Sequence, residues 1–248
     1  GLVIRVGVHG AGGRMGAATV AAVGAADDLE LVATAGRGDE LRVFAEAGCD
    51  VVVDFSTADA ARVALPWLAM HGIHAVSGTT GLTPDDFVAF RAAFGDGAAH
   101  CVWAPNFAIS AVLLMRLAEL AAPWFDTVEG LEFHHNAKVD APSGTAVATA
   151  ERIAAARGDV PWAADPTRHE VLPGARGGAG PSGVRVHGVR MVGMNAHQEV
   201  LFGTAGQTLT LRQDSYDRSS FMPGVLLACR RVGEHPGLTI GLDAIVGI

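Results

Sequence analysis

The chain has 248 residues, of which half are apolar and 18% are charged, and its formal net charge is −8. This length is enough for one large domain or two modest ones. The negative charge argues against non-specific binding to nucleic acid or to an acidic membrane surface. The longest apolar run, residues 108–120, is interrupted by Ser110, Arg116 and Glu119 and is too short and too polar to span a membrane. We therefore expect neither a nucleic acid nor a membrane as a partner.

Three cysteines, Cys49, Cys101 and Cys229, lie far apart and form no Cys-x-x-Cys pair. An odd number of cysteines at this spacing favours buried, reduced thiols over a disulfide framework or a zinc site. The first residues carry no signal-peptide pattern of charged and then apolar residues. We therefore expect a cytoplasmic protein with no metal site.

The first hundred residues alternate short apolar runs with alanine-rich helical stretches. We expect strands over Val3–Val8, Leu29–Ala35, Val51–Phe55, Ile73–Val76 and His100–Trp103, and helices over Arg14–Val23, Glu40–Ala47, Ala58–His71 and Pro84–Phe94. Apolar strands separated by helices indicate a parallel sheet that is covered on both faces. This α/β pattern is typical of doubly wound, Rossmann-like nucleotide domains.

The pattern changes after a predicted helix over Phe107–Ala122. We expect strands over Val128–His135, Val184–Met194, Glu199–Phe202 and Thr208–Arg212, a helix over Ser143–Ala156, and a mobile glycine-rich loop over Gly174–Gly183. These segments predict an α+β domain with a mixed or antiparallel, hairpin-rich sheet. A helix over Ser220–Arg231 and a strand over Leu238–Leu242 then restore the first pattern. We infer a nucleotide domain of residues 1–106 and 217–248 and a second domain of residues 107–216.

The segment GVHGAGGRMG follows the first strand and opens the first helix. Gly10, Gly13 and Gly16 form Gly-x-x-Gly-x-x-Gly; Gly12 adds a Gly-x-Gly, but Met15 stands at the third position of the usual Gly-x-Gly-x-x-Gly. Small residues let the backbone approach a pyrophosphate, and a helix N-terminus offers free N–H groups. A tight turn without a ligand is the alternative, but the order of strand, turn and helix favours dinucleotide binding.

The end of the second strand bears on which dinucleotide binds. NAD sites usually carry an acidic residue there, which holds the ribose 2′-OH. Here the strand ends in the residues ATAGR, with Gly36 where the acid is expected and Arg37 beside it. Arg37, together with Arg14, could pair with the 2′-phosphate of NADP through a guanidinium fork. The alternative is a solvated loop arginine. We expect NADPH to be preferred over NADH.

Residues 142–145 predict an anion site at the start of a helix. Pro142 suits a first helical turn, and Asp140 could cap it. Ser143, Gly144 and Thr145 would then offer N–H groups and two hydroxyls at the helix N-terminus. Such a site suits a carboxylate.

Two histidines and a lysine precede this helix. His134 and His135 end the predicted strand, and Lys138 adds a positive charge near the anion site. Together with the helix start, this grouping favours proton delivery to an anionic substrate, with His134 as the acid and Lys138 as a second donor or an electrostatic anchor. The alternatives are a packed histidine with a surface lysine, or a metal site. Adjacent histidines on a strand diverge, which counts against the metal site.

With these segments identified, the sequence resembles the dihydrodipicolinate reductases (4-hydroxy-tetrahydrodipicolinate reductases) of bacterial lysine biosynthesis over nearly its whole length. The family hallmark E-x-H-H-x-x-K-x-D-A-P-S-G-T-A runs unbroken over residues 132–146. The segments GAGGRMG (10–16), DFS (54–56), GTTG (78–81) and APNFAI (104–109) resemble the family's cofactor domain. The segments GARG (174–177), HQEVLFG (197–203) and RSSFMPGVLLA (218–228) are similar to actinobacterial-type members.

The resemblance implies proton transfer by His134 and Lys138, with substrate binding by His135, Gly144 and Thr145 beside the Ser143 inferred above. It implies nucleotide binding by Gly10, Ala11, Gly12, Gly13, Arg14, Met15, Gly78, Thr79, Thr80, Ala104, Pro105, Asn106 and Phe107. It also implies a homotetramer formed through the substrate-binding domains of residues 107–216, a hinge between the domains, and use of both NADH and NADPH.

The implied activity is the NAD(P)H-dependent reduction of 4-hydroxy-tetrahydrodipicolinate, through its dehydrated cyclic imine, to tetrahydrodipicolinate. A paralogous reductase of a related anionic cyclic imine in specialised metabolism would keep the same hallmark. A non-catalytic NADP-binding sensor is a further alternative, although the intact pair of His134 and Lys138 counts against it. Gly36, Gln213 and the pair Met194-Asn195 depart from similar members and bear on cofactor and substrate preference.

Overall fold

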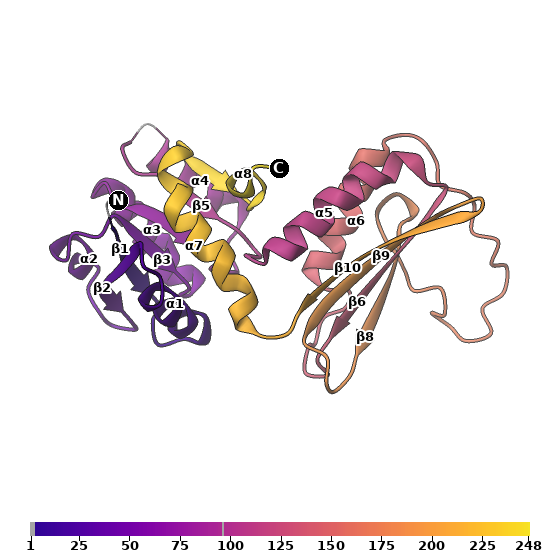
Figure 1. Ribbon diagram of the computed structural model, residues 1–248, viewed down its shortest axis with the longest axis horizontal. Helices are drawn as coiled ribbons and strands as arrows, with labels where there is room; N and C mark the ends of the chain where they lie inside the picture. The colour runs from indigo at the N-terminus through magenta and orange to yellow at the C-terminus, as the bar shows by residue number, and fades with distance from the viewer. Residues whose placement is uncertain (1–2, 96) are drawn as a thin grey trace. The chain divides into compact units, whose positions relative to one another are not determined.

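A computed structural model describes residues 3–95 and 97–248, which form two compact units (Figure 1). Unit 1 contains the N-terminal part of the chain as far as Ile109 and resumes at Arg218, and unit 2 is Ser110–Asp217. The first two residues of the predicted nucleotide domain, Gly1 and Leu2, lie outside the described residues. No helix in the described ranges is long and apolar enough to cross a membrane.

Unit 1 is built on a six-stranded parallel sheet in the order β11-β5-β4-β3-β1-β2. Its strands are β1 (Ile4–His9), β2 (Leu29–Ala35), β3 (Val51–Asp54), β4 (His74–Ser77), β5 (Cys101–Trp103) and β11 (Leu238–Ile240). Its helices are α1 (Arg14–Gly24), α2 (Arg42–Glu46), α3 (Ala58–Met70), α4 (Pro84–Phe94), α7 (Met222–Arg231) and α8 (Asp243–Val246), with short 3₁₀ turns at Arg218–Phe221 and Val232–Glu234. The predicted Rossmann-like architecture is confirmed.

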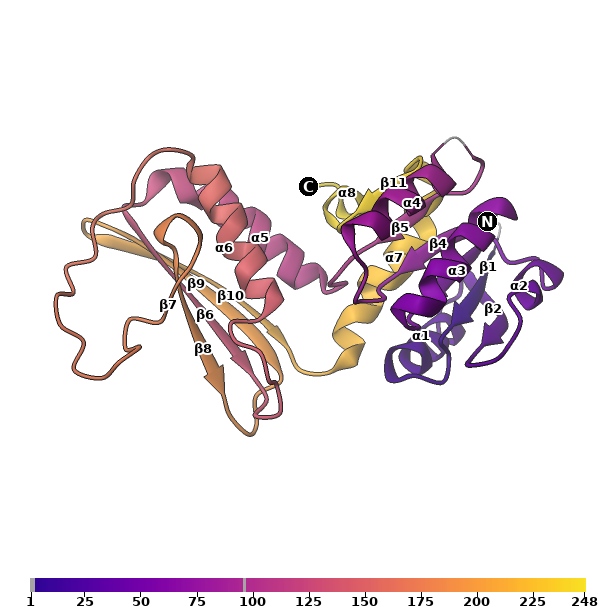
Figure 2. The ribbon, with the colours of Figure 1, turned by 180° about the vertical axis from the view of Figure 1, so that it is seen from behind.

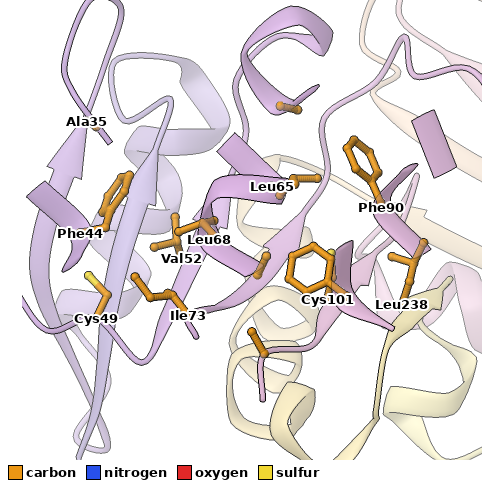
Figure 3. Close-up of a cluster of buried hydrophobic side chains, with 14 residues drawn as sticks. Ala35, Phe44, Cys49, Val52, Leu65, Leu68, Ile73, Phe90, Cys101 and Leu238 are labelled. Atoms are coloured by element: carbon orange, nitrogen blue, oxygen red, sulfur yellow. The ribbon is translucent and has the colours of Figure 1, made fainter. Parts of the chain in front are cut away.

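The sheet of unit 1 is buried because helices cover both of its faces. All four residues of β3 are buried, as expected for an inner parallel strand. On one face, Phe44, Leu65, Leu68 and Phe90 pack with the side chains of the strands (Figure 3). Burial of each such side chain contributes about 1.5–3 kcal/mol to the stability of the fold. The cluster therefore holds the strands, and with them the strand ends, in fixed positions.

The three cysteines are free and buried, as predicted. Burial raises the pKa of the Cys49 thiol to about 11 and that of Cys229 to about 12. It also raises the pKa of Cys101. Because the thiolate is the reactive form, these side chains act as small core residues.

Unit 2 contains a five-stranded sheet in the order β10-β9-β6-β8-β7. Its strands are β6 (Thr127–His134), β7 (Gly178–Ala179), β8 (Arg185–Arg190), β9 (Ala196–Thr204) and β10 (Gln207–Ser215). The helices α5 (Ile109–Ala121) and α6 (Gly144–Arg157) lie side by side over one face of the sheet, as Figure 2 also shows, and 3₁₀ turns lie at Ala122–Trp124 and Pro181–Gly183. The core beneath them includes Ile153, Val200 and Phe202.

The sheet of unit 2 is mixed rather than purely antiparallel. β6 pairs with β8 in parallel, and the other pairs are antiparallel. A parallel neighbour needs a crossover connection, and α6 with the long segment after it provides one. β8 ends at Arg190, four residues before the predicted end, because the chain turns at Gly193, where φ is +92°. β9 and β10 are longer than predicted, because their backbone pairing continues from the apolar centre into polar residues.

Candidate active site

The site in unit 2 begins at the end of β6. His134 is the last residue of β6, and Glu132 lies two residues earlier on the same face of the strand. The Nδ1 atom of His134 lies 2.5 Å from Oε2 of Glu132, whose carboxylate is fully buried. An ionised carboxylate only accepts hydrogen bonds, so Nδ1 carries the proton of the neutral imidazole. The other ring nitrogen, Nε2, is then the free basic position.

Arg190 holds the other side of Glu132. It stands opposite His134 in the parallel pairing of β6 and β8. Its Nη1 and Nη2 atoms donate to the two carboxylate oxygens at 2.7 and 2.8 Å, and the N–H of Ser143 donates to Oε1 at 3.1 Å. Burial pushes the pKa of Glu132 upward, but the hydrogen bonds from Arg190, His134 and Ser143 outweigh it and hold the pKa below its usual value.

The loop after β6 brings further charge to the same place. The Nζ of Lys138 donates to Oδ1 of Asp140 at 2.7 Å, and Nη2 of Arg190 donates to the Asp140 carbonyl at 2.6 Å. The hydrogen bond from Lys138 lowers the pKa of Asp140. The prediction that Asp140 caps the next helix is wrong, because its carboxylate is engaged by Lys138.

Helix α6 is capped by Ser143, whose hydroxyl accepts a hydrogen bond from the N–H of Ala146 at 3.2 Å. Pro142 therefore precedes the cap and does not lie in the first turn, contrary to the prediction. Ser143 is buried, and both its hydroxyl and its N–H are engaged within unit 2. Gly144 is exposed, and a Cβ there would meet nothing within 4 Å. The N–H groups of Gly144 and Thr145 thus lie at the positive end of a 14-residue helix, where an anion is favoured.

The chemistry of this cluster follows from its charges. Burial lowers the pKa of His134, and the charges of Lys138 and Arg190 lower it further. The hydrogen bond that His134 donates to Glu132 only partly offsets them. His134 is therefore neutral at neutral pH. The structure brings together the predicted His134, Lys138, Gly144 and Thr145 in unit 2, whereas His135 lies exposed just beyond the strand. The cluster can bind a carboxylate and exchange a proton.

In unit 1 the glycine-rich turn joins β1 to α1 as predicted. Gly10 has φ of +78°, and a Cβ there would lie 2.3 Å from the carbonyl oxygen of Phe55. A Cβ on Gly16 would lie 2.0 Å from the carbonyl oxygen of Gly10. A Cβ on Gly12, by contrast, would meet nothing within 4 Å. Gly10 and Gly16 are thus required by packing, and Gly12 faces space that a ligand can enter.

Two cavities lie at the carboxyl ends of the strands of unit 1. The larger, about 470 Å³, is lined by His9, Gly10, Gly12, Gly13, Gly36, Arg37, Phe55, Ser56, Thr57 and Ala60. The second, about 210 Å³, is lined by Met15, Phe55, Gly78, Ala104, Pro105, Asn106, Phe107 and Phe221. In open α/β sheets, nucleotides bind at this edge, where the strand order reverses; here the reversal falls between β1 and β3. No side chain caps α1, so its first N–H groups are available to a phosphate.

Most of the predicted nucleotide-binding residues line these cavities. The exceptions are Ala11, Arg14, Thr79 and Thr80. Among the described residues, these four line neither cavity. The N–H groups of Gly10 and Ala11 both donate to the carbonyl oxygen of Ala35, at 2.8 and 3.2 Å. The buried Thr79 directs its hydroxyl to Asp54 at 2.7 Å. The open position at Gly12 and the uncapped helix fit the phosphates of a dinucleotide, and Arg37 is exposed at the larger cavity.

Sequence reasoning missed three groups in the two units. Asp54 is fully buried and accepts hydrogen bonds from Ser56, Ser77, Thr79 and His9, at 2.6, 2.8, 2.7 and 2.8 Å. Burial pushes the pKa of Asp54 upward, but these hydrogen bonds outweigh burial and hold the pKa below its usual value. The available signal was a polar residue at or next to the end of three predicted strands, namely His9, Asp54 and Ser77.

The other two missed residues are Glu132 and Arg190. Glu132 could have been identified from the two-residue period of a strand, which places it on the same face as His134. Arg190 has no such local signal, because its position depends on the parallel register of β6 and β8.

Comparisons with known proteins find matches over both units of the chain. The family described as dihydrodipicolinate reductase, N-terminus, matches residues 4–107, and the family described as dihydrodipicolinate reductase, C-terminus, matches residues 110–246. The chain is 55% identical over 252 residues to a 4-hydroxy-tetrahydrodipicolinate reductase of Nocardia farcinica, and 53% identical over 249 residues to one of Corynebacterium diphtheriae, with 100% of each chain covered.

A solved structure gives the same result. The dipicolinate-bound dihydrodipicolinate reductase of Paenisporosarcina sp. TG-14 is 37% identical in sequence, with a TM-score of 0.89, 98% of this chain covered and 100% of that chain covered. Both units of the chain are therefore matched by the family models, by the full-length relatives and by this structure. The chain therefore belongs to the dihydrodipicolinate reductase family, whose members are oxidoreductases that use a pyridine nucleotide.

Proposed function

We propose that the protein reduces 4-hydroxy-tetrahydrodipicolinate, through its dehydrated cyclic imine, to tetrahydrodipicolinate in the diaminopimelate pathway to lysine. The observation that carries this proposal is the cluster in unit 2, where His134 on Glu132 stands with Lys138 and the start of α6. A site of this kind suits a ring that bears carboxylates and needs a proton. Family membership supports the same reaction.

In this proposal the residues of unit 2 bind the substrate and supply its proton. One carboxylate accepts hydrogen bonds from the N–H groups of Gly144 and Thr145, with Ser143 holding the helix start in place. Lys138 and His135 offset the remaining negative charge. A reduced nicotinamide, held by the cavities of unit 1, would supply the hydride that a ring carbon conjugated with the imine accepts. His134 gives the adjacent carbon the one proton that balances the hydride, and Lys138, the alternative donor for that proton, stabilises the negative charge that develops on the ring.

His134 must gain its proton before it can act as the acid. The histidine is neutral in the protein alone, because burial, Lys138 and Arg190 lower its pKa. A dicarboxylate beside the ring favours the imidazolium. We infer that His134 takes up its proton as the substrate binds, so that proton uptake accompanies binding of the anion.

The proposed cofactor is NADPH, with NADH as a weaker substitute. Arg37 at the larger cavity supports this preference, since a guanidinium suits the 2′-phosphate of NADPH. The remaining predicted contacts, from Ala11, Arg14, Thr79 and Thr80, stay part of the proposal. The cytoplasmic location and the homotetramer formed through unit 2 also stay predictions.

The activity is tested by following NADPH oxidation with the enzymatically generated pathway substrate. Parallel assays use cyclic imines that carry a single carboxylate. We expect kcat/KM for the pathway substrate to exceed that for the monocarboxylates by at least about 100-fold. A monocarboxylate lacks the second carboxylate, so some anion-binding groups of the site would have no partner. A preference for another imine would identify a paralogue. NADPH binding without turnover of any imine would identify a sensor.

A further inference from the structure

We propose that the buried ion pair of Glu132 and Arg190 is a positioning device that fixes the tautomer and direction of His134. The inference rests on the proposed function, because it concerns the same proton donor. Glu132 and Arg190 are positioning residues, since they act through His134 and not on the substrate.

The geometry of the pair supports this role. The Glu132 carboxylate is fully buried, and Arg190 binds both of its oxygens in a fork, at 2.7 and 2.8 Å. The fork leaves the carboxylate fixed in one plane, with Oε2 2.5 Å from Nδ1 of His134. A bidentate guanidinium gives orientation as well as energy. The imidazole is therefore held with Nδ1–H on Glu132 and Nε2 directed away from it.

The charges of the pair also matter. A lone buried carboxylate beside the ring would strongly favour the imidazolium. Arg190 neutralises that carboxylate, so His134 can both gain and release a proton during a turnover. Among the described residues, the charged groups that act on His134 are Glu132 on β6, Arg190 on β8 and Lys138 in the loop before α6. Asp140 in the same loop pairs with Lys138.

The same strand contains a matched comparison. Glu129 also contacts one histidine, His187, at 2.5 Å, and one arginine, Arg176. Glu129 and Glu132 are three residues apart on β6, so their side chains lie on opposite faces of the sheet. Glu129→Gln therefore removes a partly exposed carboxylate that has the same kinds of partner and no contact with His134.

The first test is Glu132→Gln, with Glu129→Gln as the control. We expect Glu132→Gln to lower kcat by about 100-fold, because the glutamine can offer either its oxygen or its NH₂ to Nδ1 and no longer imposes one tautomer. The KM for substrate should change by less than about 3-fold. Loss of the carboxylate also removes the interaction that raises the His134 pKa. As the pH rises, His134 should therefore lose its proton earlier, and the rate should begin to fall at a lower pH than in the wild type. Glu129→Gln should match the wild type in kcat and in pH profile.

The second test concerns Arg190. Arg190→Lys keeps the charge and loses the fork, and Arg190→Met loses both. We expect kcat to fall in the order wild type, Arg190→Lys, Arg190→Met, with partial rescue by the lysine. Equal kcat values in the wild type and Arg190→Met would overturn the proposal, as would an unchanged pH profile in Glu132→Gln.

A third measurement does not depend on activity. Nitrogen-15 NMR of wild-type protein, with the His134 signal assigned by His134→Gln, reports which ring nitrogen is protonated. We expect Nδ1–H in the wild type; an Nε2–H tautomer would overturn the proposal even if Glu132→Gln failed to fold. If the wild type shows the Nδ1–H tautomer but does not reduce the pathway substrate, the proposed function fails and the positioning role stands.

Discussion

At the scale of single residues, Arg37 is the side chain that most directly connects the sequence to cofactor choice. It is exposed at the larger cavity, one residue after the Gly36 that replaces the expected acid. The N–H of Gly36 is bound by the carboxylate of Asp39 at 2.8 Å, so the backbone before Arg37 is held in place. A fixed backbone with an exposed guanidinium suits a phosphate that NADPH has and NADH lacks.

Arg37→Ala should therefore weaken NADPH selectively. A hydrogen bond to a charged group contributes about 1.5–3 kcal/mol, so the KM for NADPH should rise by roughly 10- to 100-fold. The KM for NADH should change by less than about 3-fold. Steady-state kinetics with both cofactors measure this, with Arg42→Ala as the control, since Arg42 is exposed and pairs with Glu40. Equal losses with the two cofactors would contradict the assignment.

The residues of unit 2 show what sequence reasoning can and cannot find at this scale. His134, Lys138 and Gly144 could be predicted because they occupy one short segment at the end of a strand and the start of a helix. The role of Ser143 as a cap could not be separated from ligand binding without its hydrogen bonds. Arg190 could not be found at all, since it reaches Glu132 from a strand more than fifty residues further along the chain.

At the scale of elements, the turn between β1 and α1 separates two roles of glycine. Gly16 lets α1 pack against the turn, where a Cβ would lie 2.0 Å from the carbonyl oxygen of Gly10. Gly12 lines the larger cavity, where a Cβ would meet no protein atom within 4 Å. Gly16 is needed for the fold, and we propose that Gly12 gives a ligand access to the backbone.

Two substitutions test this division. Gly16→Ala should destabilise the protein by about 1–3 kcal/mol, because the turn must shift to admit the methyl group. Gly12→Ala should change the stability by less than about 0.5 kcal/mol. It should weaken NADPH binding by at least roughly 10-fold, because the added methyl group would occupy the space that we propose for the pyrophosphate. Thermal unfolding and a fluorescence titration with NADPH measure the two effects. Full NADPH affinity in Gly12→Ala, or wild-type stability in Gly16→Ala, would refute the division.

Most elements of unit 1 could be predicted, because its buried parallel strands are apolar and its helices begin and end at clear signals. The helix α4, for instance, was expected over its observed range, where Thr83 and Asp86 form a reciprocal cap. Unit 2 was harder. Its parallel pairing of β6 with β8 depends on a crossover through α6, and no local pattern in β8 encodes its partner.

At the scale of the whole molecule, the proposed reaction draws on both units. Unit 1 provides the glycine-rich turn and the cavities that suit a dinucleotide, and unit 2 provides the proposed proton donor and carboxylate site. In each unit the polar groups of the site lie where strands end. The core of each unit fixes its strands, and it thereby fixes the positions of these polar groups. Family membership, shown over both units, supports this assignment of roles.

The central claim is that His134 delivers the proton to the substrate. Single-turnover oxidation of NADPH, with the lysine-pathway substrate, tests it in His134→Ala. We expect the rate to fall by about 10²–10⁴-fold, while the affinity for dipicolinate changes by less than about 10-fold and His187→Ala retains the wild-type rate. An unchanged rate in His134→Ala would contradict the claim.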